Sequence, residues 1–302
     1  MESLNYLRKA SEYLRSTLIP SLKKRGFAGD AVATEAILTL AHNSEKFILP
    51  EGGRIFDDRL RGLPDKLTLP FPSIVIEYTS LKQEGLVEKV FPGGTTTATK
   101  RIVVALQQDD RIKIYSICSW NEGPQWGMQP WYAEVTKNWD GPMMDVPEVA
   151  AGVLPEQGKI PGLAISLQKV DRLAERIAGP GWQKNAYYDM LDEINAVLSL
   201  IEALACSNVG HEVIRARKPN KGAMKHGALP FDDYRVLVIK QQKGKTRSDG
   251  IGSHDSPREH LRRGHIRRLP DKQIWVNPCV VNPGIGAKVD KQYNVQRMER
   301  AA

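Results

Sequence analysis

Long apolar runs are missing from this sequence, and their absence excludes one large class of proteins. No stretch reaches the roughly 18–20 consecutive apolar residues that a helix needs to cross a bilayer, although 41% of the 302 residues are hydrophobic. The N-terminal segment, MESLNYLRKASEYLRS, is polar and charged where a secretory signal peptide has its apolar region. We therefore expect a cytoplasmic protein with no membrane partner.

Cysteine is also scarce. The three cysteines, Cys118, Cys206 and Cys279, are odd in number and far apart, which argues against a disulfide framework. We expect them to be reduced and buried. The chain also has no Gly-x-x-x-x-Gly-Lys-Ser/Thr loop, because the segment FPGGTTTATK (91–100) lacks the required spacing from glycine to lysine. No cofactor is expected.

Charge is distributed unevenly along the chain. Residues 211–302 contain 20 Lys and Arg but 9 Asp and Glu, an excess of 11 positive charges, whereas the formal net charge of the whole chain is +8. The basic character therefore belongs wholly to the C-terminal third. Such an asymmetry indicates a polyanionic partner for that region, nucleic acid above all.

The hydrophobic patterning of the first half predicts a helical hairpin followed by β structure. Leucines at helical spacing predict a helix over about residues 3–25, and a second helix follows at about 31–46, opened by Asp30. A strand is predicted at 73–79, and a β-hairpin is predicted to turn at Asp109-Asp110. The sequence PWYAEVTKNW predicts another strand, and the Pro- and Gly-rich stretch before residue 163 predicts a loop.

Residues 183–206 form the strongest predicted helix. Its apolar face consists of Met190, Ile194, Val197, Leu198, Ile201 and Leu204. The segments VGHEVIRARK and DYRVLVIKQ then predict strands, the second one buried, and a further hairpin is expected across Pro270-Asp271-Lys272. We predict an α+β fold in which mixed or antiparallel sheets surround this long core helix. Its expected domains are residues 1–162, with the helical hairpin and a Trp-containing β-rich region, and residues 163–302, with the core helix and a basic β-rich region.

The basic region contains the run SPREHLRRGHIR, at residues 256–267. It resembles a family of uncharacterised proteins carried by bacteriophages and other mobile elements, which share a Ser-Pro-Arg-x-His-x-Arg-Arg-Gly-His-x-Arg core. In this chain the core residues are Ser256, Pro257, Arg258, His260, Arg262, Arg263, Gly264, His265 and Arg267. The segment LPFPSIVIEY is similar to an upstream segment of those proteins. The resemblance implies a phage or prophage origin and no established activity.

Arginine is unusually dense in this run, and its chemistry suggests phosphate binding. Five arginines occur between residues 258 and 268, and the planar guanidinium fork matches two phosphate oxygens at once. The leading hypothesis is therefore nucleic-acid binding without chemistry, with RNA expected in preference to DNA. The residues assigned to binding are Arg258, Arg262, Arg263, Arg268, Lys245 and His254.

Histidine in the same run raises a second hypothesis, metal-independent RNA cleavage. One histidine would accept the 2′-OH proton, a second would protonate the leaving 5′-oxygen, and an arginine would stabilise the phosphorane charge. In the predicted strand HIRRL, His265 and Arg267 share one face, with Ile266 on the other. The catalytic residues would then be His260, His265 and Arg267.

Two metal hypotheses fit the sequence less well. His254, His260, His265 and Cys279 are candidate zinc ligands, but their spacers of five, four and thirteen residues match no common zinc motif. Flanking arginines would also repel the cation. Asp57 and Asp58 could bind Mg²⁺ beside Glu77, as in a nuclease, yet no second acidic cluster accompanies them. We expect no metal.

Four tryptophans at residues 120, 126, 131 and 139 support a competing class of function. An aromatic stripe can stack on bases, but packing in a β-rich core explains it more simply. If the indoles were exposed, they would favour a phage-encoded factor that docks on a host protein and catalyses nothing. Steep salt dependence would distinguish nucleic-acid binding from such a hydrophobic interface.

Overall fold

The computed structural model describes eleven segments of the chain, and everything below concerns these residues. They are residues 4–55, 67–80, 98–120, 125–137, 163–170, 182–216, 229, 231–240, 260–262, 265–276 and 279–281. The helical elements are α1 (Tyr6–Tyr13), the π-turn η1 (Leu14–Leu18), α2 (Ile19–Lys24), α3 (Ala28–Asn43), the 3-10 turn η2 (Glu51–Gly53) and α7 (Trp182–Leu204). The strands of the main sheet are β1 (Glu45–Ile48), β2 (Ser73–Thr79), β3 (Ala98–Gln108), β4 (Arg111–Trp120), β5 (Gly127–Met128), β6 (Trp131–Lys137), β7 (Leu163–Lys169), β8 (Val209–Ile214) and β9 (Tyr234–Ile239). Four short strands follow, which are β10 (His260–Arg262), β11 (His265–Arg268), β12 (Gln273–Val276) and β13 (Cys279–Val281).

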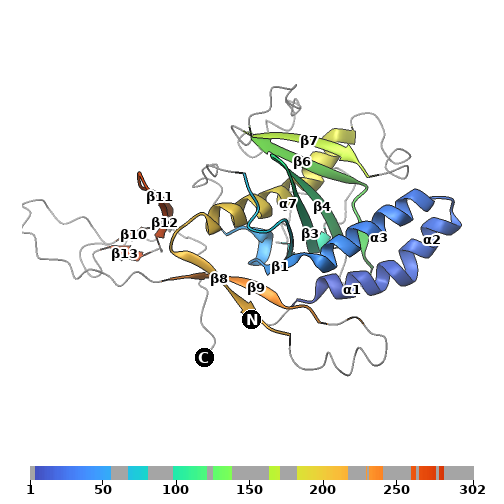
Figure 1. The fold of residues 1–302 in the computed structure, drawn as a ribbon, viewed down its shortest axis with the longest axis horizontal. Helices are drawn as coiled ribbons and strands as arrows, with labels where there is room; N and C mark the ends of the chain where they lie inside the picture. The colour runs from blue at the N-terminus through green and yellow to red at the C-terminus, as the bar shows by residue number, and fades with distance from the viewer. Residues whose placement is uncertain are drawn as a thin grey trace, which may run out of the picture.

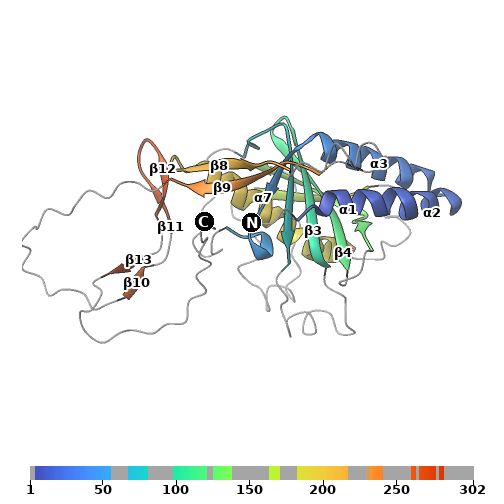
Figure 2. The same ribbon diagram turned by 90° about the horizontal axis from the view of Figure 1, so that it is seen from below.

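The N-terminal segment forms the expected helical hairpin, with α1, η1 and α2 in one arm and α3 in the other. Both views show the two arms side by side (Figures 1 and 2). Gly26, at φ 83, occupies the left-handed region where the first arm ends, a conformation that glycine adopts without a steric penalty. The second helix begins earlier than expected, at Ala28, so Asp30 lies in its first turn. There its carboxylate faces the positive end of the helix dipole.

A mixed sheet of nine strands forms the centre of the fold. Its order is β7-β6-β4-β3-β2-β1-β9-β8, and β5 pairs with β4. Strand β1 runs parallel to both β2 and β9, while the other pairs of neighbouring strands described in the sheet are antiparallel. The expected strand at 73–79 is confirmed, and the β3–β4 hairpin turns at the expected Asp109-Asp110, where Asp109 takes φ 54.

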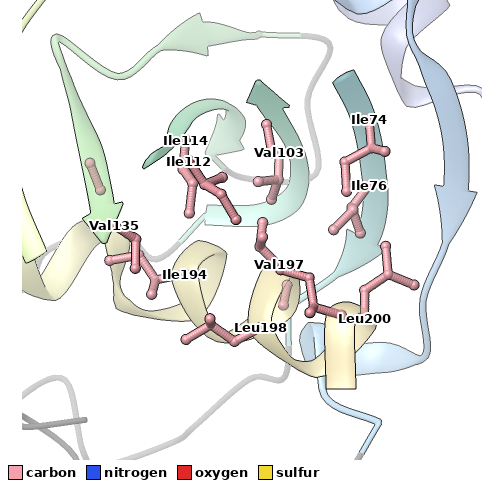
Figure 3. Packing of buried hydrophobic residues seen from close by; sticks show 14 of the residues in the cluster. Ile74, Ile76, Val103, Ile112, Ile114, Val135, Ile194, Val197, Leu198 and Leu200 are labelled. Atoms are coloured by element: carbon pink, nitrogen blue, oxygen red, sulfur yellow. The ribbon is translucent and has the colours of Figure 1, made fainter. Parts of the chain in front are cut away.

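Each face of the sheet carries its own apolar cluster. Alternation along β2 directs Ile74 and Ile76 to the cluster that includes α7, and Val75 to the cluster that includes α1–α3. Figure 3 shows α7 on the first face, where Ile194 lies beside Val135 of β6 and Val197 lies beside Val103 of β3. The helices therefore cover both faces of the sheet, and the fold is α+β.

One sheet spans both halves of the chain. Strands β7, β8 and β9 all follow residue 162, yet they pair in the same sheet as β1–β6, which precede it. The loop expected before residue 163 lies outside the described residues. Strand β9 is less buried than its apolar run suggested, since only Tyr234 and Leu237 are buried. The reason is its position beside β8, which ends the sheet.

The hairpin of β11 and β12 lies at the opposite end of the molecule from α2 (Figures 1 and 2). It packs beside the end of α7, since Ile266 and Trp275 are packed against the α7 cluster. In the described part of the chain, no helix combines the length and apolar content that a bilayer span requires.

Candidate nucleic-acid interface

The described part of the Arg- and His-rich run forms two short strands, β10 and β11, each of which pairs with one partner strand. Strand β11 pairs antiparallel with β12, and the turn between them is closed by the Leu269 amide, which donates to the Lys272 carbonyl at 2.8 Å. This confirms the expected hairpin across Pro270-Asp271-Lys272. Strand β10 pairs antiparallel with β13. The two pairings are separate two-stranded sheets, and the residues between them, 263–264 and 277–278, lie outside the described segments. We call β10–β13 the ribbon.

The inner face of the β11–β12 hairpin is directed toward the protein body. Ile266 lies opposite Trp275 in the register, and both pack against the α7 cluster. Arg268 lies opposite Gln273, which is buried. The Arg268 guanidinium reaches Glu202 of α7, with 3.4 Å between Nη2 and Oε1, and the Glu202 side chain is fully buried. Arg268, assigned to nucleic-acid binding by the sequence, thus also ties the hairpin to α7.

Asn208 fixes the hairpin to the loop after α7. Its side-chain amide Nδ2 donates to the Trp275 carbonyl at 2.8 Å, and its Oδ1 accepts from the Trp275 amide at 2.7 Å. The neighbouring Ser207 amide donates to the Gln273 carbonyl at 2.8 Å. The side chain of Asn208 therefore pairs with β12 much as another strand would, and it holds the hairpin in a defined position.

The outer face of the hairpin carries the predicted chemistry. His265 and Arg267 alternate with Ile266 and Arg268 along β11, so they lie on the face opposite the body. The contacts of Ile266 and Arg268 with the α7 side agree with the expected inner face of the strand. Arg267 is exposed and His265 is partly exposed. Their cross-strand partners are Ile274 and Val276, so the outer face combines basic and apolar side chains.

The remaining predicted site residues are only partly covered by the structure. His260 and Arg262 belong to β10, of which the backbone alone is described. Four more residues lie outside the described segments, namely Arg258, Arg263, Lys245 and His254. The structure therefore brings His265, Arg267 and Arg268 together on one strand. Their proximity to the other predicted residues stays a prediction.

Metal ligation receives no support from the residues that are described. Across those segments, no three His, Cys, Asp or Glu side chains gather as metal ligands. Of the four zinc candidates, His265 alone has a described side chain. Cys118 and Cys206 are buried, as expected, and form no disulfide within the described residues. Burial raises the pKa of Cys206 to about 11, and the nearby Glu202 carboxylate adds to the rise, so this thiol stays protonated at neutral pH.

Glu77, considered as a magnesium ligand, has a structural role instead. Its side chain is fully buried and accepts three hydrogen bonds, from the Tyr6 and Leu7 amides at 2.9 and 2.8 Å and from the Tyr234 hydroxyl at 2.8 Å. These bonds satisfy two amides in the first turn of α1. Burial raises the pKa of Glu77 to about 7, against the effect of the three donors and with a further rise from Asp232. Asp57 and Asp58 lie outside the described residues.

A second buried polar cluster, formed around Arg101 and Glu193, was not predicted. Glu193, fully buried on α7, is in contact with the Arg101 guanidinium and accepts from the Ser116 hydroxyl at 2.7 Å. Arg101 also donates from Nε to the Ser80 hydroxyl at 2.9 Å. Burial lowers the pKa of Arg101, but Glu193, together with smaller contributions from Tyr78, Cys118 and Asp192, outweighs that effect, and the pKa stands above its ordinary value. The cluster joins α7 to β3 and β4 beneath the sheet.

Tyr78 closes this cluster on the side of η2. Its ring is fully buried, and burial raises the pKa of its hydroxyl, with Glu193 adding to the rise. A Cβ at Gly53 would lie 2.9 Å from Tyr78 Cζ, and Gly53 also has φ 67, so only glycine fits beside the ring. Arg101, Glu193 and Tyr78 are enclosed by the fold, and we infer that they stabilise it. The sequence signal for them was a charged residue inside each apolar pattern, Arg101 in β3 and Glu193 in α7.

The tryptophans do not form a shared surface in the described residues. Trp126 is 5% exposed in the α1–α3 cluster, where its ring centroid lies 5.8 Å from that of Tyr6. Trp131 packs partly buried against the α7 cluster on the other face of the sheet. The side chain of Trp120 is not described, and Trp139 lies outside the described residues. Trp126 and Trp131 therefore serve in packing of the core rather than in a binding surface.

Comparison of the chain with protein-family models, with curated proteins and with solved structures found no match. The interpretation of the ribbon therefore depends on its own geometry and chemistry.

Proposed function

We propose that this protein binds nucleic acid through the outer face of the ribbon. The observation that carries the proposal is the two-faced β11 strand. Ile266 and Arg268 attach it to the body, while His265 and Arg267 face away from the body. A guanidinium held on a fixed, exposed strand can contact phosphate without first losing the entropy of an ordering step.

The distribution of charge supports a polyanionic partner. The excess of 11 positive charges lies within residues 211–302, which include the whole ribbon. Arg262 lies on β10 and Arg267 and Arg268 lie on β11, whereas the partner strands β12 and β13 contain no charged residue. A one-sided cationic strand is suited to follow a phosphate backbone. No cofactor is part of the proposal.

A salt titration with a matched pair of variants tests this function. Labelled RNA and DNA are titrated with the wild-type protein at increasing salt, where binding should weaken steeply. Arg267→Ala should lower the affinity and reduce the slope of log K against log salt by about one unit, because the variant neutralises one phosphate fewer. The control is Arg111→Ala, which removes the same charge from a side chain that is 47% exposed and lies on β4, away from β8 and β9 in the sheet order.

Two results would overturn the proposal. One is an absence of binding at low salt to every oligonucleotide tested. The other is an equal loss of affinity in Arg267→Ala and Arg111→Ala, since a diffuse charge effect would then explain binding. Tight binding of a protein partner with an affinity that does not change with salt would instead favour the competing class, a factor that docks on a host protein through an apolar surface.

Metal-independent RNA cleavage is the second candidate, and one observation favours it. His265 and Arg267 stand two residues apart on the same exposed face, as a proton-transfer group and a phosphate-binding group must. The second histidine of the mechanism, His260 or His254, is part of the hypothesis only. His265→Ala should then abolish cleavage, a loss of about 10²–10⁴-fold, and leave RNA affinity nearly intact. Cleavage should also survive EDTA and require the 2′-OH. A wild-type protein that binds RNA and leaves it whole would remove this candidate.

The resemblance of the 256–267 run to proteins of mobile elements extends the proposal to cellular context. We place the protein in the cytoplasm of a bacterial host, encoded by a phage or prophage, where chromosomal and phage nucleic acids are both accessible. Fractionation of a host that expresses the tagged chain tests this placement. Recovery of the chain with the membrane after a high-salt wash would contradict it.

A further inference from the structure

We propose that the preferred partner of the ribbon is duplex DNA in the B form, bound in its major groove. This inference rests on the proposed function, names its substrate class and reverses the expectation from the sequence that RNA is preferred to DNA. It begins from the shape of the β11–β12 hairpin, which is two antiparallel strands in one register. The major groove of B-DNA, about 12 Å wide, admits a two-stranded β-ribbon. The major groove of A-form RNA is deep and narrow, so the same ribbon does not enter it.

The composition of the outer face matches what this groove displays. Arg267 lies directly opposite Ile274, and His265 lies opposite Val276. In the major groove, guanine offers two acceptors to one arginine fork, and thymine offers a methyl group to apolar side chains. Cross-strand neighbours lie about 5 Å apart. One face of the ribbon can therefore contact a guanine edge through Arg267 and a thymine methyl through Ile274 or Val276.

Single-stranded nucleic acid fits this face less well. Proteins that bind single strands stack bases on exposed aromatic rings. The ribbon's one aromatic residue among those described, Trp275, lies on the inner face and packs against the α7 cluster. Its backbone is also held by Asn208, so the ring is not available to an oligonucleotide without release of the hairpin. The described outer face carries no Phe, Tyr or Trp.

The attachment of the ribbon also suits a groove. The hairpin is held at one end of the molecule by Asn208 on the loop after α7 and by Glu202 on α7. In Figures 1 and 2 it lies apart from the helical hairpin of α1–α3, at the far end of the longest axis. Among the described elements, this position keeps the helical hairpin of α1–α3 away from a duplex bound at β11–β12.

The test compares four labelled oligonucleotides of one sequence at one salt concentration. They are a DNA duplex of about two helical turns, the corresponding RNA duplex, single-stranded DNA and single-stranded RNA. We expect the DNA duplex to bind at least about tenfold more tightly than any of the other three. Methyl green, which occupies the major groove, should displace the protein, and netropsin, which occupies the minor groove, should not.

A substitution at Arg267 separates groove contact from charge. Arg267→Lys keeps the positive charge but loses the planar fork, so its affinity should fall less on random-sequence DNA than on selected duplexes. On duplexes selected for tight binding by the wild-type protein, the variant should lose about 10-fold or more in affinity. Equal binding of the selected and random duplexes by the wild-type protein would contradict base contacts by the ribbon.

The failures of the two proposals are distinguishable. If an RNA duplex or a single strand binds as tightly as the DNA duplex, or if netropsin alone displaces the protein, the major-groove inference is wrong and nucleic-acid binding stands. If none of the four oligonucleotides binds at low salt, the proposed function itself fails and this inference fails with it.

Discussion

The body of the protein and the ribbon use charged side chains in opposite ways. In the body, Glu77 and Glu193 are fully buried, and each is engaged by groups from other elements. Lys46, with its side chain 8% exposed, pairs with Asp232 at 3.3 Å. On the outer face of the ribbon, Arg267 is exposed and lies opposite an apolar residue. The charges of the body hold elements together, whereas those of the ribbon's outer face are turned to solvent.

This difference explains how one chain can hold a basic ribbon in a fixed place. A buried charge is costly unless it is paired, so its position is set by the fold. An exposed charge is solvated in both the folded and the unfolded state, so it changes the free energy of unfolding little. Such a residue can therefore serve in binding a partner without a loss of stability. Arg268 belongs to both groups, because its guanidinium is 44% exposed while its partner, Glu202, is fully buried. It lies where the body and the ribbon meet.

The largest expected effect comes from the buried pair in the body. Arg101→Met leaves Glu193 buried without its cation, and we expect a loss of about 3–5 kcal/mol in the free energy of unfolding. Arg267→Met, the matched change on the ribbon, should stay within about 0.5 kcal/mol of the wild type. Urea denaturation measures both. Adding Glu193→Leu to Arg101→Met should restore much of the stability. Similar losses in Arg101→Met and Arg267→Met would contradict the difference between the charges of the body and those of the ribbon.

The second effect is a dependence of stability on pH that originates at Glu77. Its pKa in the folded protein, about 7, is above its ordinary value of 4.5. The folded state therefore binds the proton of Glu77 more tightly than the unfolded state does. The stabilisation of the fold by this proton is complete below pH 4.5 and is lost as the pH rises through 7. Other groups being equal, stability should fall by about 3 kcal/mol across that window. Denaturation at several pH values measures the slope.

Glu77→Gln provides the control for this slope. Glutamine cannot ionise, so the variant should lose the pH-dependent component whatever its overall stability. Tyr234 and Asp232, the titratable groups that act on Glu77, remain in place in the variant. An unchanged slope between pH 4.5 and 7 would assign the effect to other groups.

The third effect concerns the junction between the body and the ribbon. Asn208→Ala removes two hydrogen bonds to Trp275, worth about 0.5–1.5 kcal/mol each. The β11 and β12 amides should therefore exchange roughly 10–100-fold faster, while the amides of β2 and β3 keep their protection. Glu212→Ala, an exposed change on the neighbouring β8, should alter neither set. Uniform loss of protection in every strand would show that the hairpin opens only with the whole fold.

The smallest effect is expected for an exposed ion pair of the body. Arg15 and Glu35 join the two arms of the helical hairpin at 2.8 Å, but their side chains are 36% and 45% exposed. Solvent screens such a pair, so Arg15→Ala should cost less than about 1 kcal/mol, and the cost should shrink further in high salt. A cost close to that of Arg101→Met would mean that burial does not separate the two kinds of charge.

Local patterns were sufficient for much of the secondary structure. The strand at 73–79, the turn at Asp109-Asp110 and the hairpin across Pro270–Lys272 depend on side-chain alternation and turn chemistry within a few residues. The two faces of β11 followed from the same alternation. These features could be read directly from the sequence because each is determined by contacts between near neighbours.

Only part of the candidate site could be predicted from the sequence. The density of arginine and histidine identified the run, but Arg268 carries the same charge as Arg267 and differs from it in position alone. The sequence could not show that Arg268 reaches Glu202, 66 residues away. It also could not show that the carboxamide of Asn208 pairs with β12. Both contacts depend on where α7 ends relative to the hairpin.

What the sequence determined by itself was the type of each local element and the basic character of the C-terminal third. What only the tertiary structure decided was the pairing of distant elements. Strand β1 lies between β2 and β9, Glu77 reaches the Tyr6 amide 71 residues away, and Arg101 meets Glu193 across 92 residues. Alternation fixes which face a side chain takes, because it is a property of the extended backbone. The partner of a buried charge is fixed by desolvation, which acts only when the whole fold has removed water from that charge.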